Sequence, residues 1–190
     1  MKAICLKPTS LTWLVALTAL LIASPAPAQD GKVKLKVGDV APFVAGLNQD
    51  GKEWKLADAA GKKVVLLYFY PKADTPGCTT EACEFRDAFP TFHGVNAVIL
   101  GISPDTPKAQ AKFRKKYDLG VTLAPDPDKV AAEAYGVWVE KSMYGRKYMG
   151  VDRSTFLIDP KGRIAHSWRK VKVPGHAEAV LAALKSAAAA

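Results

Sequence analysis

Two runs of apolar residues in the middle of the chain have the composition of strands that are buried on both faces. Every position of Val64–Tyr70 is aliphatic or aromatic, and Ala97–Ile102 is nearly as apolar. Such runs are typical of central strands with both faces covered. By contrast, Lys108–Tyr117 mixes apolar and basic residues at helical spacing, which predicts an amphipathic helix that ends near Gly120.

Shorter patterns complete the predicted order of elements. The segments Asn48–Gly51 and Asp159–Gly162 each separate two apolar stretches and are hairpin signals. We expect the helix after the first central strand to end at Pro90, because proline lacks the amide proton that a helix interior requires. The remaining predicted elements are strands Phe43–Leu47, Glu53–Leu56, Val121–Ala124, Thr155–Ile158 and Ile164–Trp168, an edge strand in Gln29–Val37, and helices Thr79–Phe89, Asp128–Tyr135 and His176–Ser186.

The order of these elements predicts the fold class. Strands alternate with helices through most of the chain, and a hairpin and a last helix follow. This order predicts an α/β fold in which helices flank a central mixed β-sheet.

The first 28 residues have the features of an export signal. Lys2 and Lys7 precede an apolar stretch, Leu11–Ala23, and Ala26–Ala28 has the small residues of a cleavage site. The apolar stretch is shorter than the roughly 20 residues that span a bilayer, which disfavours the alternative of an uncleaved membrane anchor. We therefore expect a cleaved signal peptide, residues 1–28, a single domain, residues 29–190, and export to a bacterial periplasm.

The charge of the chain is basic but dispersed. Its 27 lysines and arginines exceed its 18 acidic residues, for a formal net charge of +9. No arginine-rich or aromatic-interleaved basic tract is present, so we expect no nucleic-acid partner. Solubility, with weak attraction to anionic surfaces, is the simpler interpretation of this charge.

The segment after the first central strand carries the candidate chemistry. Cys78 follows a Thr-Pro-Gly turn at the expected start of a helix, and Cys83 lies five residues further on. A helix start stabilises a thiolate, because its free N–H groups and the helix dipole favour negative charge. The third cysteine, Cys5, would be lost with the signal peptide.

These residues resemble the active-site signature of the peroxiredoxins. The pattern Pro-x-x-x-Thr-x-x-Cys is present at Pro71, Thr75 and Cys78, and Cys83 extends the resemblance to the Q-type branch, also called bacterioferritin comigratory protein. The segments Gly101–Asp105 and Arg153–Asp159 are similar to further peroxiredoxin segments, and the match covers most of the chain. The resemblance implies a thioredoxin-like fold and thiol peroxidase activity.

The resemblance also implies a role for each site residue. Cys78 would be the peroxidatic cysteine, and Cys83 the resolving cysteine that forms a disulfide with it. Arg153 would contact the thiolate and polarise the peroxide, and Glu81 would orient Arg153. Thr75 and Pro71 would complete the site, Thr75 by placing its hydroxyl beside the sulfur and Pro71 by stiffening the loop.

The same resemblance bears on cofactors and partners. It implies no metal, flavin or haem, because the cysteines carry the electrons. Hydrogen peroxide or an organic hydroperoxide would be the substrate, a thioredoxin-like dithiol protein the reductant, and a monomer the expected state. The export signal departs from many members of the family and leaves the reductant open.

The spacing of the two cysteines carries a conformational prediction. Five residues of regular helix separate two Cα atoms by about 7.5 Å of rise and about 140° of rotation, or roughly 8.6 Å in space. A disulfide requires less than about 7 Å between Cα atoms. Cys78 and Cys83 can therefore react only if the first turns of the helix unwind.

Other interpretations of the same residues remain open at this point. The cysteines could form an inert disulfide in an exported thioredoxin-like module, although a disulfide that strains a helix would stabilise the fold poorly. A thiol–disulfide oxidoreductase would be expected to carry Cys-x-x-Cys. Arg153 could be a surface residue at a strand end, and Glu81 a first-turn helix acid. Zinc is disfavoured, since the histidines are scattered and are expected in surface or packing positions: His93, His166 and His176.

Overall fold

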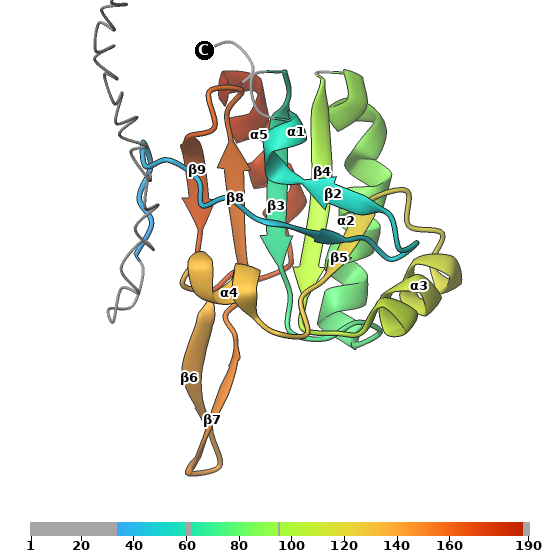
Figure 1. The fold of residues 1–190 in the computed structure, drawn as a ribbon, viewed down its shortest axis with the longest axis vertical. Coiled ribbons are helices and arrows are strands. Elements are labelled where there is room, and N and C mark those ends of the chain that lie inside the picture. Colours follow the sequence, from blue (N-terminus) through green and yellow to red (C-terminus); the bar gives the residue numbers. More distant parts are fainter. Residues whose placement is uncertain (1–33, 60–61, 95, 188–190) are drawn as a thin grey trace, which may run out of the picture. The chain divides into compact units, whose positions relative to one another are not determined.

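A computed structural model describes residues 34–59, 62–94 and 96–187, so the predicted signal peptide lies outside the described residues. A five-stranded sheet has the order β5-β4-β3-β8-β9 (Figure 1). Its strands are β3 (Val64–Phe69), β4 (Ala97–Ser103), β5 (Thr122–Pro125), β8 (Ser154–Ile158) and β9 (Ile164–Trp168). Strands β3, β4 and β5 are parallel, whereas β8 and β9 are antiparallel to their neighbours. The predicted mixed sheet is confirmed.

The central strand β3 explains why the sheet is buried on both faces. All of its residues are buried, as the apolar run predicts. Leu66 and Tyr68 pack into the core on one side of the sheet, with helices α2 (Pro76–Gly94), α3 (Pro107–Lys116) and α5 (His176–Ala187). Leu67 and Phe69 pack into the core on the other side, with helix α4 (Val130–Ala134). The pleat of one apolar strand therefore supplies both cores.

Helix α2 continues beyond Pro90, so the prediction that it ends there is wrong. The helix runs to Gly94, with Pro90 inside it and exposed. Proline removes one backbone hydrogen bond, but the last turn brings Phe92 into the core, where its ring packs edge-on against Phe85. Burial of a phenylalanine contributes about 2 kcal/mol or more, which offsets much of the loss.

The N-terminal part of the described chain differs in two ways from the prediction. Residues 34–37 are not a strand, and the nearest pairing is an isolated bridge between Val40 and Arg163. The predicted hairpin is present as β1 (Ala45–Leu47) and β2 (Glu53–Lys55). Leu56, however, begins a short helix, α1 (Leu56–Ala59), and its side chain enters the core.

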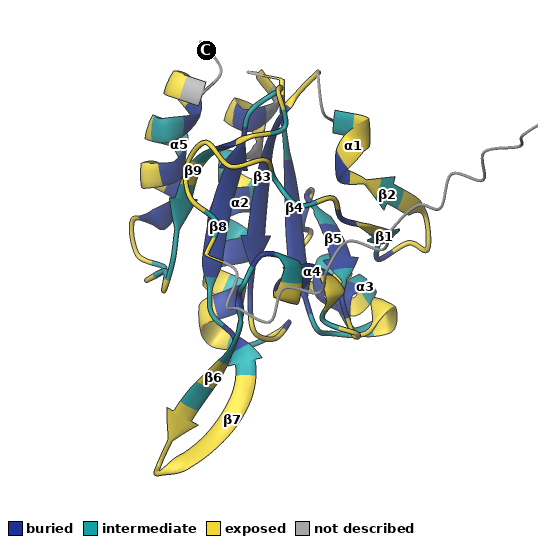
Figure 2. Cartoon of the chain, turned by 60° about the vertical axis from the view of Figure 1, so that its left-hand side comes forward, coloured by how far each residue is buried: buried dark blue, intermediate teal, exposed yellow. Residues whose placement is uncertain are grey.

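A second hairpin was not predicted. Strands β6 (Trp138–Met143) and β7 (Arg146–Val151) pair with each other and project from the end of the sheet at which β3 finishes (Figure 1). Most of this hairpin is exposed, in contrast to the buried strands of the sheet (Figure 2). Among the described residues, no helix has the length and apolar content needed to cross a membrane.

Candidate active site

Cys78 lies in the first turn of helix α2, directly beyond the carboxyl end of β3. Its side chain is buried, with 2% of its surface exposed. The helix begins at Pro76, a residue type favoured in the first turn because proline has no amide proton to satisfy. Helix geometry leaves the N–H groups of Gly77 and Cys78 without an intrahelical carbonyl. These amides and the helix dipole favour negative charge at this end of the helix.

Arg153 reaches the sulfur from the neighbouring strand. It directly precedes β8, and the pairing of Phe69 with Ser154 places it beside the end of β3. Its Nη2 lies 3.1 Å from Cys78 Sγ, and its Nη1 donates a hydrogen bond to Glu81 Oε2. The guanidinium therefore bridges the thiol and the carboxylate, as the resemblance implies. The alternative of a surface arginine is excluded, because only 15% of the Arg153 side chain is exposed.

Glu81 is a buried carboxyl one helical turn beyond Cys78. It is 1% exposed, and its Oε1 has no hydrogen-bond partner among the described residues. Burial raises the pKa of Glu81 to about 7, while the charge of Arg153 and its hydrogen bond act in the opposite direction. Glu81 thus holds one side of the guanidinium and leaves Nη2 directed at the sulfur.

The loop between β3 and α2 is anchored to its surroundings at two points. Asp74 adopts a left-handed conformation, with φ of 60°. Its carboxylate accepts hydrogen bonds from Lys116 Nζ at 2.8 Å and from the Tyr117 hydroxyl at 2.7 Å. The amide of Ala73 donates to Asp105 Oδ2 at 2.7 Å. These contacts connect the cysteine loop to α3 and to the segment after β4.

The structure places Thr75 and Pro71 in the loop that precedes α2. The Thr75 hydroxyl donates to the carbonyl of Lys72 at 2.9 Å, and the described residues show no hydrogen bond between it and Cys78. In this structure the proton of the Thr75 hydroxyl is therefore directed at the loop carbonyl and not at the sulfur. Pro71 directly follows Tyr70 and is exposed.

Cys83 lies on the same helix as Cys78. Both cysteines are free thiols; Cys78 is buried, and Cys83 is half-buried. Helix α2 is continuous from Pro76 to Gly94, so it includes the whole interval between them. The folded helix therefore keeps the two residues at the regular helical spacing that forbids a disulfide.

One buried histidine near the site was assigned only a surface or packing role by the sequence. His176 Nε2 lies 2.8 Å from Thr155 Oγ1, and its ring packs edge-on against Phe85 and Trp168. Burial lowers the pKa of His176 to about 4, and the charge of Arg153 adds to this effect. It is therefore a neutral packing residue. The described residues hold no cluster of side chains that could bind a metal ion.

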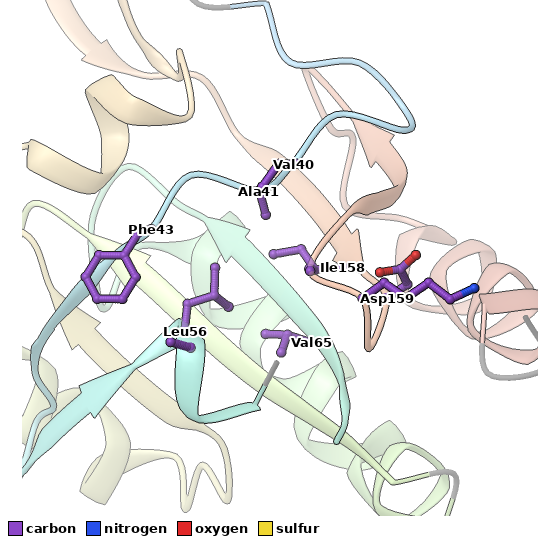
Figure 3. A pocket seen from close by; sticks show the side chains of 10 residues that line it. Val40, Ala41, Phe43, Leu56, Val65, Ile158 and Asp159 are labelled. Atoms are coloured by element: carbon purple, nitrogen blue, oxygen red, sulfur yellow. The ribbon is translucent and has the colours of Figure 1, made fainter. Parts of the chain in front are cut away.

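An apolar pocket lies at the other end of the sheet. Its volume is about 190 Å³, and Phe43, Leu56, Val65 and Ile158 are among its lining residues (Figure 3). Val65 pairs with Ile158 at the end of the β3–β8 pair opposite to the Phe69–Ser154 pair. The pocket is therefore remote from Cys78 and forms no part of the thiol site.

Comparison with known proteins identifies the class. The model of the AhpC/TSA family matches residues 37–167, which is most of the chain. The chain belongs to this family, and its fold is the thioredoxin-like fold of its structural neighbours.

Its similarity to individual members places it in the Q-type branch of the peroxiredoxins. Peroxiredoxin Bcp of Bacillus subtilis is 47% identical over 151 residues, which cover 80% of this chain and 96% of the relative. The solved structure of peroxiredoxin Q from Xylella fastidiosa, a cysteine-to-serine mutant, has a TM-score of 0.77 and 39% identity, and covers 81% of this chain and 98% of the other. That of the Xanthomonas campestris bacterioferritin comigratory protein, a protein with alkyl peroxide reduction activity, has a TM-score of 0.73 and 43% identity, with 76% and 92% covered.

Proposed function

We propose that the protein is a thiol peroxidase in which Cys78 reduces hydrogen peroxide or an organic hydroperoxide. The observation that carries this proposal is the 3.1 Å contact between Arg153 Nη2 and Cys78 Sγ in the first turn of α2. A cation and free helix amides at the sulfur stabilise the thiolate, which is the nucleophilic form of cysteine. The alkyl peroxide reduction activity of the Xanthomonas relative supports the choice of substrate.

The first step oxidises Cys78. The thiolate attacks one peroxide oxygen, the O–O bond breaks, and the other oxygen leaves with the bonding electron pair. This oxygen takes up a proton and becomes water or an alcohol, and Cys78 becomes a sulfenic acid. Arg153 and the amides of Gly77 and Cys78 can donate hydrogen bonds to the charge that develops on the leaving oxygen.

Three further residues assist this step. Glu81 holds the Arg153 guanidinium by its Nη1, so that Nη2 stays on the sulfur side. The Thr75 hydroxyl, now bound to Lys72, can rotate to hydrogen-bond an arriving peroxide. Pro71 limits the conformational freedom of the loop that carries Thr75 and leads into α2.

Cys83 completes the reaction on the protein. After α2 has unwound at its start, the Cys83 sulfur attacks the Cys78 sulfenic sulfur and displaces hydroxide, which leaves as water. The product is an intramolecular Cys78–Cys83 disulfide. Since this step needs no second subunit, we propose that a monomer is sufficient.

A thioredoxin-like dithiol protein then reduces the disulfide by thiol exchange. The residues that precede the described chain support export, because they combine an early positive charge, an apolar stretch and a small-residue cleavage site. We place the mature protein in a bacterial periplasm, where a dithiol partner of the same compartment would supply the electrons.

The test is the rate of thiol loss when the reduced protein is mixed with hydrogen peroxide. We expect oxidation orders of magnitude faster than that of free cysteine at the same pH. Cys78→Ser should abolish the fast phase, whereas Cys83→Ser should retain it and accumulate sulfenic acid. A rate equal to that of free cysteine, together with a loss of stability in Cys78→Ser, would favour an exported module with a structural disulfide instead.

A further inference from the structure

The β6–β7 hairpin projects from the domain beside the thiol site. Its base is fixed to the domain, because Val151 at the end of β7 is buried and the amide of Asp152 donates to the carbonyl of Val137 at 2.8 Å. Arg153, which contacts Cys78, follows two residues after β7. The hairpin therefore extends from the end of the sheet that carries the reactive sulfur (Figure 1).

The turn of this hairpin has an unusual residue at its tip. Tyr144 and Gly145 both have positive φ, 52° and 76°, which is the pattern of a type I′ turn. Asparagine and glycine are favoured at such positions, whereas a bulky side chain is strained there. Tyr144 is nevertheless 97% exposed and gains nothing from burial. A strained, fully exposed aromatic residue at a loop tip is a reason to look for a function.

One face of the hairpin combines apolar and cationic side chains. In the strand register Lys141 lies opposite Tyr148, and Met143 lies opposite Arg146. These four residues share one face, because the side chains of a strand alternate between its two sides. We call this face, together with Tyr144 at the tip, the hairpin face. Met143, Tyr144, Arg146 and Tyr148 are exposed, and Lys141 is half-buried.

The charges on the two sides of the hairpin are unequal. The one acidic residue of the two strands, Glu140, lies on the opposite face, across from Met149, and forms an ion pair with Lys147 at 3.1 Å. The hairpin face thus has two cations and no carboxylate of its own strands. The side chains of Tyr148 and Lys141 both lie over Gly150, where an added Cβ would be 3.3 Å from Tyr148 Cε2 and 3.6 Å from Lys141 Cδ.

We infer that the hairpin face is the docking surface for the dithiol protein that reduces the Cys78–Cys83 disulfide, and that this partner presents carboxylates to it. Tyrosine, methionine and arginine are the residues enriched at protein–protein interfaces. Two cations without neighbouring acids on their face select a partner with a negative patch and steer its approach. The inference rests on the proposed function, because it assigns the partner of the same thiol site.

Docking at this place serves a defined redox step. One thiolate of the partner attacks a sulfur of the Cys78–Cys83 disulfide, which forms a mixed disulfide and releases the other cysteine. The second thiolate of the partner then attacks the partner's first sulfur in the mixed disulfide and releases the remaining cysteine of this protein. The partner gives up two electrons and two protons and becomes a disulfide, and Cys78 and Cys83 return to thiols.

Three variants of the full chain test the inference. Tyr144→Asn replaces the strained residue by one that the turn favours, so it should fold at least as well as the unaltered protein. Lys141→Glu/Arg146→Glu reverses both charges of the hairpin face. Lys63→Glu/Lys185→Glu is the control with the same change in net charge. Both lysines are exposed; Lys63 directly precedes β3, at the end of that strand opposite to Cys78, and Lys185 lies in the last turn of α5.

The measured quantities are the rate constants of two separate half-reactions. Reduction of the disulfide form is followed with a purified thioredoxin, recycled by thioredoxin reductase and NADPH, and with dithiothreitol as a small reductant. We expect the hairpin charge reversal to slow reduction by thioredoxin about tenfold or more and to remove its dependence on salt, because the steering charge is lost. Tyr144→Asn should slow reduction of the disulfide by thioredoxin severalfold. Reduction by dithiothreitol, and oxidation of the reduced protein by peroxide, should not change.

Other results would overturn the inference. These are equal rates with thioredoxin for all variants, equal losses in the Lys63/Lys185 control, or reduction of the unaltered protein by dithiothreitol but not by thioredoxin. Loss of binding to vesicles that contain phosphatidylglycerol, with unchanged thioredoxin rates, would assign the hairpin to a membrane surface instead. Absence of fast peroxide oxidation in the unaltered protein would refute the proposed function separately.

Discussion

Arg153 Nη2 lies 3.1 Å from Cys78 Sγ although 75 residues separate the two in the sequence. The contact depends on the antiparallel pairing of β8 with β3, which places the start of one strand beside the end of the other. The sheet thus brings a fixed cation to a helix start, where the dipole already favours negative charge.

The first prediction concerns the removal of this cation. Arg153→Ala should slow the oxidation of Cys78 by hydrogen peroxide about a hundredfold, which is the usual effect of losing one donor to a developing oxyanion. Arg153→Lys should recover only part of the rate, because an ammonium cannot bridge the sulfur and Glu81 as the guanidinium does. Stopped-flow measurement of thiol loss gives both rates.

Two observations control this experiment. Arg163→Ala removes an exposed arginine whose Nη1 donates to the carbonyl of Gly38, far from the thiol, and should leave the rate unchanged. The reactivity of Cys83 toward a thiol reagent should change little in Arg153→Ala. Equal oxidation rates in Arg153→Ala and the unaltered protein would remove Arg153 from the site.

The second prediction concerns the opening of α2. Because Cys78 and Cys83 lie on one continuous helix, the disulfide form must lose helical structure at the start of α2. Amide hydrogen exchange in Thr79–Asp87 should therefore be faster in the disulfide form than in the reduced form. Helix α4 carries no cysteine and packs on the other side of the sheet, so it serves as the internal reference. Equal protection of Thr79–Asp87 in both forms would exclude the unwinding step.

The third prediction concerns the attachment of the cysteine loop to α3. Asp74 accepts hydrogen bonds from Lys116 and Tyr117, and the hydrogen bond from Lys116 is the main reason that the pKa of Asp74 is lowered. Lys116→Met with Tyr117→Phe removes both donors without altering the left-handed backbone at Asp74. The loop should then open more often, so that Cys83 reaches the sulfenic acid sooner.

The measurement is the yield of Cys78 sulfinic acid at high peroxide, followed by mass spectrometry. Faster disulfide formation competes with further oxidation, so the double variant should form less sulfinic acid than the unaltered protein. Lys115→Met, on the same helix and exposed, is the matched control. An unchanged or higher sulfinic yield in the double variant would show that these contacts do not restrain the loop.

The sequence predicted the strands of the sheet and the helix that carries Cys78, because these elements depend on local signals. The apolar run of β3, the turn before β9 and the Pro71–Cys78 motif are all continuous in the chain, and the structure has the expected strands and helix at these places. By contrast, the contacts of Asp74 with α3 and of Thr155 with His176 join segments far apart in the sequence. No local pattern indicates such pairs.

The two main errors also have physical causes. Pro90 remains inside α2 because the burial of Phe92 offsets the cost that the local rule assigns to an interior proline. The β6–β7 hairpin was missed because its strands bury little, and its turn has Tyr144 where an asparagine would have been the signal. We explain the tyrosine at this turn by the proposed docking of the reductant and not by a role in folding.

The fourth prediction concerns the pH dependence of stability through Glu81. Burial raises its pKa to about 7 in the folded protein, from an ordinary value of 4.5. Between these values the folded protein keeps a proton that the unfolded chain has released. Stability from this group is therefore complete below pH 4.5 and is lost as the pH rises toward 7. The expected loss is roughly 3 kcal/mol in the free energy of unfolding.

Glu81→Gln tests this linkage, because glutamine does not titrate and should remove the Glu81 contribution to the fall in stability over that range. The measurement is urea unfolding at several pH values, with exposed Glu133→Gln as the matched control. The slope should persist in the control and flatten in Glu81→Gln. If Glu81→Gln kept the full slope, the carboxyl would be ionised throughout this range in the folded protein, and Arg153 rather than burial would determine its charge.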